Sequence, residues 1–571
     1  MNPANNLTDA NRARQAWLVA SILALLLLAQ GFYAVHLNKL YYQSFGPFYD
    51  SVAYTNRMAD FYKVSRAEGF LATLPMLKNE TIALAFIEVA LVAPLVDLSR
   101  TLGVWLQSIW LIALALSVYY YLHRHRHVAP WLALCLTLPL VSFQGIYHFN
   151  GGLSDFRMDL SQYIFFGLLT VWYLVTYETD SLAPWLLAGI FGTLGCFARS
   201  TIPVHFVLAI GPLAAWRLIR PGTMTRARLL AGIACMAGLP ALLAGSFFLY
   251  NFARLYEYYV QINLDANANL PLRTSVTHFY LVAGRAGKYT IEAALVCCLV
   301  LLRAYAPRFG SLASWVRGLD WKMLYIGIVP ALFLVLRGAG LNPFVSMPSL
   351  FGLILFAVAP VKGSLAFPGK GKKLVAAGLL VTACLVNAWT GVAAHAPVQE
   401  ASRMDTLKQI IHLIQENAAR HDKREVYYAT LYVGALHFDA FRNVLIYEFG
   451  GAPGAEMTMT SDANGLVFRS DRAGALAIVI PRDWENLPGD GDGQKVEYLA
   501  RFATEGLDYL LFPDEATLHF VEKDLGHNLF NMKTRALCRK LLESGNWEKL
   551  SGPLVVNTTE TVYLYVNTAR K

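Results

Sequence analysis

Hydrophobic positions form long uninterrupted runs through the first 396 residues of the chain and only short, patterned runs after that point. A helix that crosses a bilayer needs about twenty consecutive apolar residues. Eleven runs approach this length, the two that begin at 289 and 323 being short: 16–37, 101–122, 128–147, 160–177, 182–198, 202–219, 229–250, 289–302, 323–336, 343–361 and 374–394. The pattern predicts a multi-span α-helical membrane module over residues 1–396, with about eleven transmembrane helices.

Two segments between the runs are long enough to form substantial loops, residues 38–100 and 251–288. The first contains a further apolar run, 82–96, in which Glu88 is the single charged residue. Such a run is better suited to a helix that lies in the membrane interface than to another span.

The basic residues between the runs predict the orientation, because cytoplasmic loops of membrane proteins carry an excess of Lys and Arg. If the N-terminus is cytoplasmic, the two long loops and the C-terminus are extracytoplasmic. This orientation suits an integral, multi-pass protein of a bacterial inner membrane or another plasma membrane. The cytoplasmic side then holds these residues: Arg12, Arg14, Arg124, Arg126, Arg217, Arg220, Arg226, Arg228, Arg303, Arg308, Arg317, Lys322, Lys362, Lys370, Lys372 and Lys373.

The pattern changes in residues 397–571, where charges become frequent and long apolar runs stop. Residues 402–419 place apolar side chains on one face of a helix. Short apolar runs at 425–431, 475–480 and 507–512 predict buried strands, and 555–556 with 561–566 predict a closing hairpin. We therefore expect a C-terminal soluble α/β domain.

Composition narrows the class of protein. Charged residues make up 15% of the chain, whereas soluble globular chains carry roughly a quarter. The net charge of +9 would suit nucleic acid in a soluble protein. Here the basic residues lie between apolar runs, so they are explained as topology signals and no nucleic-acid partner is expected. None of the seven Cys residues forms a CxxC pair or a Cys/His cluster with metal spacing.

Asp50 is the first candidate for chemistry, within the sequence Phe-Gly-Pro-Phe-Tyr-Asp-Ser at 45–51. A carboxylate held among aromatic residues near a membrane surface has a raised pKa and can act as a base. The alternative is that Asp50 is only the N-cap of a following helix.

A second candidate group lies between the third and fourth runs, in the segment 150–159. Asp155 and Asp159 flank Arg157, and glycines precede them. Glycine lets a backbone approach a ligand closely. The group suits a metal, a phosphate or a sugar, or alternatively forms a surface ion pair with an N-cap at Asp159.

Cations are the third candidate group, because several lie at predicted outer ends of the runs. A cation at such a depth is costly unless it faces a cavity or a partner. Each alone is explained by contact with lipid headgroups, but the set favours a site for an anionic lipid. Its members are His148, Arg199, Arg273, His278, Arg285, Lys288 and Arg337.

This layout resembles the GT-C superfamily of membrane glycosyltransferases. The shared features are a first span, a long outer loop with an early acid (Asp50) and an interfacial helix, a second acidic group (Asp155 and Asp159), many further spans and a soluble C-terminal domain. Protein O-mannosyltransferases, lipid A aminoarabinose transferases and bacterial arabinosyltransferases share this plan. The chain departs from the first of these because Ser51, not Glu, follows Asp50, and it lacks the WWD signature of oligosaccharyltransferases.

The resemblance implies an inverting glycosyltransferase with a polyprenyl-phosphate-linked sugar as donor and a glycan, lipid or protein as acceptor. Asp50 would deprotonate the acceptor hydroxyl, and Arg157, Arg199 and Arg337 would stabilise charge on the departing lipid phosphate. Asp155 and Asp159 would hold a divalent cation, Mg²⁺ or Mn²⁺, or bind sugar hydroxyls. The remaining substrate-binding candidates are His148, Arg273 and His278.

Three other functions remain open. A secondary transporter would place charged residues near the bilayer midplane, whereas the midplane positions here are almost free of acids. A membrane glycan transferase similar to O-antigen ligases would rely on cations of a large outer loop, such as Arg254, Arg273, His278 and Arg285. A non-catalytic scaffold would leave the grouped Asp and Arg residues unexplained.

Overall fold

The computed structural model of the protein describes residues 3–45, 49–78, 80–147, 152–156, 158–221, 224–256, 293–303, 311–336, 347–362, 370–393, 403–423, 426, 428–430, 438–449, 457–462, 465–470, 478–479, 487–513, 536–537, 539–555 and 561–570. The chain divides into two compact units. The first comprises Met1–Asn38, Phe61–Asp97 and Thr101–Ala396, and the second comprises Lys39–Asp60, Leu98–Arg100 and Pro397–Lys571. The second unit therefore includes two pieces of the loop 38–100 as well as the C-terminal residues.

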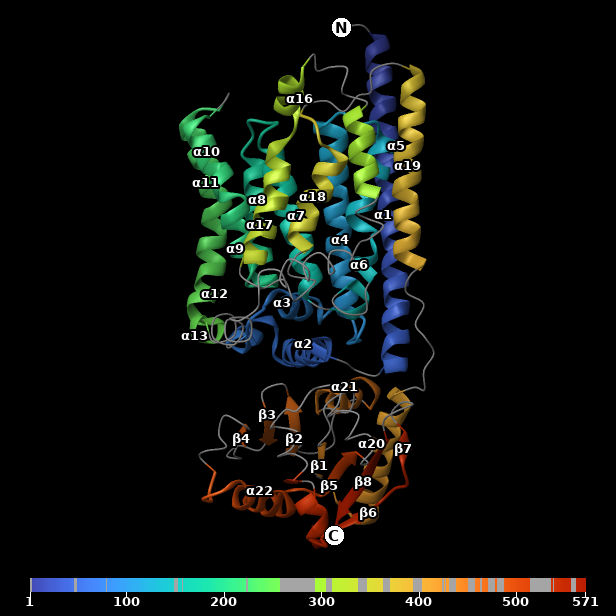
Figure 1. The fold of residues 1–571 in the computed structure, drawn as a ribbon, viewed down its shortest axis with the longest axis vertical. Coiled ribbons are helices and arrows are strands. Elements are labelled where there is room, and N and C mark those ends of the chain that lie inside the picture. The colour runs from blue at the N-terminus through green and yellow to red at the C-terminus, as the bar shows by residue number, and fades with distance from the viewer. Residues whose placement is uncertain are drawn as a thin grey trace. The chain divides into compact units, whose positions relative to one another are not determined.

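Helices account for nearly all of the described residues before position 394 (Figure 1). Their bounds are α1 Pro3–Phe45, α2 Tyr49–Glu68, η1 Phe70–Leu77, α3 Leu84–Val92, α4 Leu102–Tyr120, η2 Tyr121–His125, α5 Pro130–Val141, α6 Gln144–Tyr147, η3 Leu153–Asp155, α7 Met158–Val175, α8 Ala183–Ala198, α9 Ile202–Ala209, α10 Gly211–Ile219, α11 Arg226–Leu239, η4 Pro240–Ala244, α12 Gly245–Tyr250, α13 Phe252–Tyr256, α16 Leu312–Gly318, α17 Trp321–Leu336, α18 Met347–Val358 and α19 Lys370–Ala393.

Five helices within the described residues are long and apolar enough to cross a membrane: Ala13–Tyr42, Leu102–His125, Met158–Val175, Ile202–Ile219 and Arg226–Tyr250. Five further apolar helices have 10–17 residues: Pro130–Val141, Ala183–Ala198, Ala293–Arg303, Pro348–Val358 and Gly378–Trp389. The protein is thus a helical membrane protein, and the count of eleven spans remains a prediction. One expected span, 128–147, is interrupted because α5 contains Pro139 and ends at Val141, and proline removes a backbone donor that a continuing helix needs.

The centre of the first unit is α7, which packs against α4, α8 and α18 (Figure 1). Buried positions make up 94% of α7, far more than in the other four long apolar helices. Close approach of neighbouring helices depends on small residues. A Cβ added at Gly352 of α18 would lie 2.6 Å from the backbone nitrogen of Gly327 in α17, so these two backbones meet where both side chains are missing.

The second unit combines helices with two sheets. β1 pairs parallel with β5, β5 pairs antiparallel with β8, and β6 and β7 also pair with β8; a separate antiparallel sheet has the order β2-β3-β4. The bounds are α20 Arg403–Arg420, β1 Tyr428–Thr430, α21 Phe438–Glu448, β2 Met457–Asp462, β3 Gly465–Ser470, β4 Ile478–Val479, α22 Asp492–Gly506, β5 Tyr509–Pro513, β6 Trp547–Lys549, β7 Leu554–Val555, β8 Thr561–Asn567 and η10 Thr568–Arg570. The sequence pattern predicted β1, β4, β5, β7 and β8 but neither β6 nor the β2–β3 hairpin, although Asn464-Gly465 is a common hairpin signal.

The predicted helix 402–419 is confirmed as α20. Its apolar face, Leu407, Ile410, Ile411 and Ile414, is buried, and none of these side chains is more than 5% exposed. They form one core with residues of α21, β1, β5 and β8. Periodicity alone was sufficient here because a helix against a sheet buries one continuous stripe.

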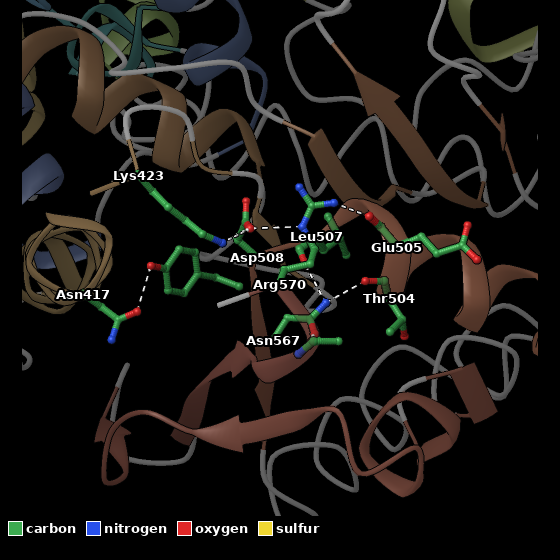
Figure 2. A network of polar contacts seen from close by, with 10 residues as sticks. Asn417, Lys423, Thr504, Glu505, Leu507, Asp508, Asn567 and Arg570 are labelled. Carbon is green, nitrogen blue, oxygen red and sulfur yellow. Dashed lines mark hydrogen bonds and ion pairs between the residues drawn. The ribbon is translucent and has the colours of Figure 1, made fainter. Parts of the chain in front are cut away.

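A network of charged and polar side chains joins the residues around Asp508 in the second unit (Figure 2). Asp508 is 2% exposed and precedes β5. Its Oδ1 lies 2.7 Å from Lys423 Nζ and accepts a 3.1 Å hydrogen bond from Arg570 Nε. Asn567 Nδ2 donates to the carbonyl oxygen of Leu507 at 2.8 Å. The last residues of the chain are therefore bonded to the start of the central strand.

Candidate functional site

Asp159 lies at the N-terminus of α7, as its second residue. Helix N-termini carry a partial positive charge, so a carboxylate is favourable there. The Asp159 side chain is only 5% exposed. A carboxylate that has lost so much water is stable as an anion only beside a positive partner.

Arg199 supplies that partner. It follows α8 directly, and its backbone is extended, which ends the helix at Ala198. Arg199 Nη2 lies 2.9 Å from Asp159 Oδ1, with the arginine side chain 13% exposed. The two residues are candidates from different segments of the sequence, and the structure brings them together.

Close packing of α7 and α8 makes this pairing possible. Gly195 lies one turn before Arg199, and a Cβ at this position would be 3.1 Å from atoms of Phe165 in α7 and Ile202 in α9. Such spacing is tighter than ordinary van der Waals contact, so a larger residue would push the helices apart. The glycine thus fixes the separation that the ion pair spans.

The segment before α7 is held by its own contacts. Ser154 Oγ donates to the carbonyl oxygen of Tyr147 at 2.6 Å, and the Ser154 carbonyl accepts from Asn38 Nδ2 of α1 at 2.7 Å. Phe156 adopts a left-handed conformation with φ of 50°. Its ring lies against α4, because a Cβ on Gly103 would come within 2.2 Å of it. The turn that contains Asp155 and leads to Asp159 is therefore fixed from α1 and α4.

Buried amides surround the next turn of α7. Gln107 Nε2 of α4 donates to Ser161 Oγ at 3.1 Å. Gln162, one turn after Asp159, is completely buried, and neither its Oε1 nor its Nε2 has a hydrogen-bond partner among the described residues. An amide buried without partners is costly. Gln162 is therefore a group that a polar ligand could satisfy.

The helix α3 and the second half of α2 lie beside this end of α8. The backbone nitrogen of Ala83, which precedes α3, donates to the carbonyl oxygen of Phe197 at 2.8 Å, two residues before Arg199. Ser65 Oγ of α2 donates to the carbonyl oxygen of Ala90 at 2.6 Å. The expected interfacial run 82–96 thus contains a helix that is bonded on both sides within the first unit.

Comparison with known proteins shows the fold of the chain. No protein-family model and no curated protein matches the sequence. Among solved structures, the chain is similar to ArnT from Cupriavidus metallidurans bound to undecaprenyl phosphate, with a TM-score of 0.54 at 10% sequence identity, over 96% of this chain and 98% of that chain. The apo structure of the same protein gives a TM-score of 0.52 at 11% identity, over 97% of this chain and 98% of that chain. The chain has the GT-C fold.

Within the GT-C fold, the remaining candidates are placed as follows. Asp50 is the second residue of α2, in its first turn and not before it, and it belongs to the second compact unit. Asp155 ends η3, in the first unit. The side chains of these two residues lie outside the described part of the structure, as do these residues entirely: His148, Arg157, Arg273, His278 and Arg337.

The predicted metal ligands are only partly described. Among the described residues, no group of three or more His, Cys, Asp or Glu side chains could hold a metal. Asp159 Oδ1 lies 2.9 Å from the Arg199 guanidinium, and the side chain of Asp155 lies outside the described part of the structure. A divalent cation at Asp155 and Asp159 therefore stays a prediction.

Two further features of the structure were not predicted from the sequence. Gln162 escaped notice because a single amide in an apolar run resembles an ordinary core position; its spacing of three residues from Asp159 was the available signal. Arg126 was interpreted only as a topology signal. It is 1% exposed and forms a 2.9 Å ion pair with Asp320, so its charge also serves a structural purpose.

Proposed function

We propose that the protein is an inverting glycosyltransferase that moves a sugar from a polyprenyl-phosphate carrier to an acceptor hydroxyl at the extracytoplasmic membrane face. The observation that carries the proposal is the buried Asp159–Arg199 pair at the adjoining ends of α7 and α8, within a GT-C fold. The similar ArnT structure holds undecaprenyl phosphate, which supports a lipid phosphate as part of the donor.

In the proposed reaction, the Asp50 carboxylate takes the proton of the acceptor hydroxyl. The acceptor oxygen attacks the anomeric carbon from the face opposite the phosphate, and the bond from that carbon to the phosphate oxygen breaks. The sugar is transferred with inversion, and polyprenyl phosphate leaves with the bonding electrons. A base in this position contributes typically 10²–10⁴-fold to the rate.

Arg199 is the proposed cation for the departing phosphate. Its fork of N–H donors suits phosphate oxygens as well as a carboxylate. Asp159 holds one side of the guanidinium at 2.9 Å, so the group is preorganised and needs little rearrangement when charge develops. Gln162 offers a buried amide for a sugar hydroxyl or a phosphate oxygen.

The finer assignments belong to the same proposal. We place the N-terminus in the cytoplasm, because the basic loops favour it, and the residues from 397 onwards in the extracytoplasmic space as a soluble α/β domain. Asp155, Arg157, His148, Arg273, His278 and Arg337 remain proposed contacts to the substrates. The acceptor is a glycan, a lipid or a protein.

The test uses the purified full chain in detergent with a panel of polyprenyl-phosphate sugars, and measures polyprenyl phosphate released. We expect one donor to be turned over, Asp50→Asn to lower turnover about 10²-fold or more, and Arg199→Gln to lower it about 10²-fold. Arg220→Gln is the control, because Arg220 is exposed at the end of α10 and stacks on Trp216. Failure with every donor would reject the function, whereas full activity of Asp50→Asn would reject only the base.

A further inference from the structure

The helix that carries Asp50, α2, is hydrogen-bonded to α21 by a buried amide. Asn443 of α21 is 0% exposed. Its Nδ2 donates to Thr55 Oγ1 and to Asn56 Oδ1, both at 2.9 Å, and its Oδ1 accepts from Arg100 Nε at 2.7 Å. An asparagine side chain has two N–H donors and one carbonyl acceptor, so every group of this amide is used.

Further contacts between α21 and α2 flank this amide. Tyr447 Oη donates to the backbone carbonyl oxygen of Thr55 at 2.8 Å, which holds the helix backbone directly. Arg442 Nη2 lies 2.9 Å from Asp60 Oδ1, one turn further along α2. α21 is therefore bonded to α2 at two successive turns.

Arg100, from a third segment of the chain, contacts α21 as well. Its guanidinium lies 5.2 Å from the ring centre of Tyr42 and 5.1 Å from that of Tyr447, and it is bonded to Glu448. Burial raises the pKa of the Glu448 carboxyl, but hydrogen bonds from Lys408 and Arg100 outweigh this effect, so the pKa is lowered overall. At the centre of these contacts, the Asn443 amide is buried and all its hydrogen-bonding groups are used, which favours a single arrangement of the helices.

The face of α2 that contacts α21 is not the face on which position 50 lies. At 100° per residue, Asp50 is rotated about 140° around the helix from Thr55 and lies roughly 7.5 Å from it along the axis. The residues one turn after Asp50 on its own face are Ala53, which is exposed, and Tyr54, which is half-buried, whereas Thr55 and Asn56 are buried. These bonds therefore hold α2 at residues that lie on another face of the helix than position 50.

We propose that Asn443 is a positioning residue for the transfer reaction, which fixes the helix that carries Asp50 through its bonds to Thr55 and Asn56. This inference rests on the proposed function. It gives the C-terminal residues a role in catalysis through α2, although they touch no reacting atom.

The test compares Asn443→Leu with Asn417→Leu in the full chain. Asn417 is a matched control, because it is also a buried asparagine of the second unit, 8% exposed, and its Oδ1 accepts a 3.0 Å hydrogen bond from Tyr509 Oη of β5 and not from a residue of α2. Two quantities are measured: amide hydrogen exchange of the α2 peptide, and kcat and KM for the donor. We expect Asn443→Leu to speed exchange in α2 and lower kcat about tenfold or more with KM little changed, and Asn417→Leu to do neither.

A double variant separates positioning from general destabilisation. If Asn443 acts through Asp50, adding Asn443→Leu to Asp50→Asn lowers the residual kcat no further, because the two effects are not independent. Additive losses, equal losses in Asn443→Leu and Asn417→Leu, or a wild-type kcat in Asn443→Leu would each overturn the proposal.

A milder variant covers the case in which Asn443→Leu does not fold. Tyr447→Phe deletes only the hydrogen bond from the Tyr447 hydroxyl to Thr55. We expect it to lower kcat about 2–10-fold and to speed amide exchange in α2. An unchanged kcat would contradict a positioning role for these contacts between α21 and α2. If wild type turns over no donor, the proposed function fails, and hydrogen exchange alone then decides whether Asn443 holds α2.

Discussion

Arg126 Nη1 lies 2.9 Å from Asp320 Oδ2, and the two side chains are 1% and 2% exposed. The same guanidinium nitrogen donates to Tyr121 Oη at 3.0 Å. The pair joins the residue after η2 to the residue before α17, 194 positions apart. Among the described residues, it is the most deeply buried of the ion pairs.

Breaking this pair should destabilise the first unit. We expect Asp320→Asn to lower the free energy of unfolding by about 3–5 kcal/mol, because it leaves an uncompensated buried cation. The measurement is the unfolding transition in detergent. The double variant Arg126→Met/Asp320→Leu is the control and should recover most of the loss, since apolar residues of similar volume often replace a buried pair without cost. A wild-type transition for Asp320→Asn would contradict the prediction.

Gly103→Ala should damage the turn before α7. The added methyl group would come within 2.2 Å of the Phe156 ring, so Phe156 and the neighbouring Asp155 must move. We expect a loss of transfer activity of about tenfold or more, measured as donor turnover. Gly378→Ala in α19 is the matched control, because nothing lies within 4 Å of the new Cβ. Equal activity of the two variants would show that the turn tolerates displacement.

Glu88 should make stability depend on pH. Burial raises the pKa of this carboxyl to about 7, although a hydrogen bond from Trp110 lowers it in part. The folded state therefore holds the proton more tightly than the unfolded state, so the contribution to stability is complete below about pH 4.5 and is lost as pH rises through 7.

Glu88→Gln removes that dependence. Between pH 5 and 8, the unfolding midpoint of wild type should fall relative to that of Glu88→Gln, by an amount equivalent to about 3 kcal/mol at most. Glu505→Gln provides a comparison outside the first unit. Parallel curves for wild type and Glu88→Gln would show that the carboxyl titrates normally.

Asp508 should support the second unit (Figure 2). Its carboxylate is bonded to Lys423 and Arg570, so Asp508→Asn leaves two cations without their partner. Because these cations are part-exposed, with side chains 24% and 32% exposed, water offsets some of the cost, and we expect about 1–3 kcal/mol. Limited proteolysis should cut the C-terminal residues faster in Asp508→Asn than in a Glu497→Gln control, whose partner is the exposed Lys540. Equal cleavage rates would contradict the prediction.

The local sequence pattern was sufficient to predict helices that bury one face and strands that consist of one apolar run. The helix 402–419 and most of its neighbouring strands were located because periodicity and apolar runs report burial directly. The apolar runs likewise located helices in the first unit, while breaks such as the one after Pro139 shortened them below a full span. Arg199 was selected because a cation at the end of an apolar run is unusual, and Asp159 because it and Asp155 flank Arg157.

Partners separated by long stretches of chain could not be predicted. The sequence around Arg126 does not indicate that its partner is Asp320, and the sequence around Asn443 does not indicate that its partner is Thr55. The neighbours of a residue in sequence carry no information on which distant segment will pack against it. The assignment of residues 38–100 to the membrane module alone was also too simple, since Lys39–Asp60 and Leu98–Arg100 belong to the second unit.

That division of the chain has a consequence for the order of folding during synthesis. The second unit needs Lys39–Asp60, which emerges early, and Pro397–Lys571, which emerges more than 300 residues later. At about 5–20 residues per second, the early piece waits roughly 20–70 s for the first residues of the later piece, and longer for the last. During that interval Thr55, Asn56 and Tyr42 lack contacts that bury them in the folded protein, so these side chains stay exposed until residues of the later piece have emerged.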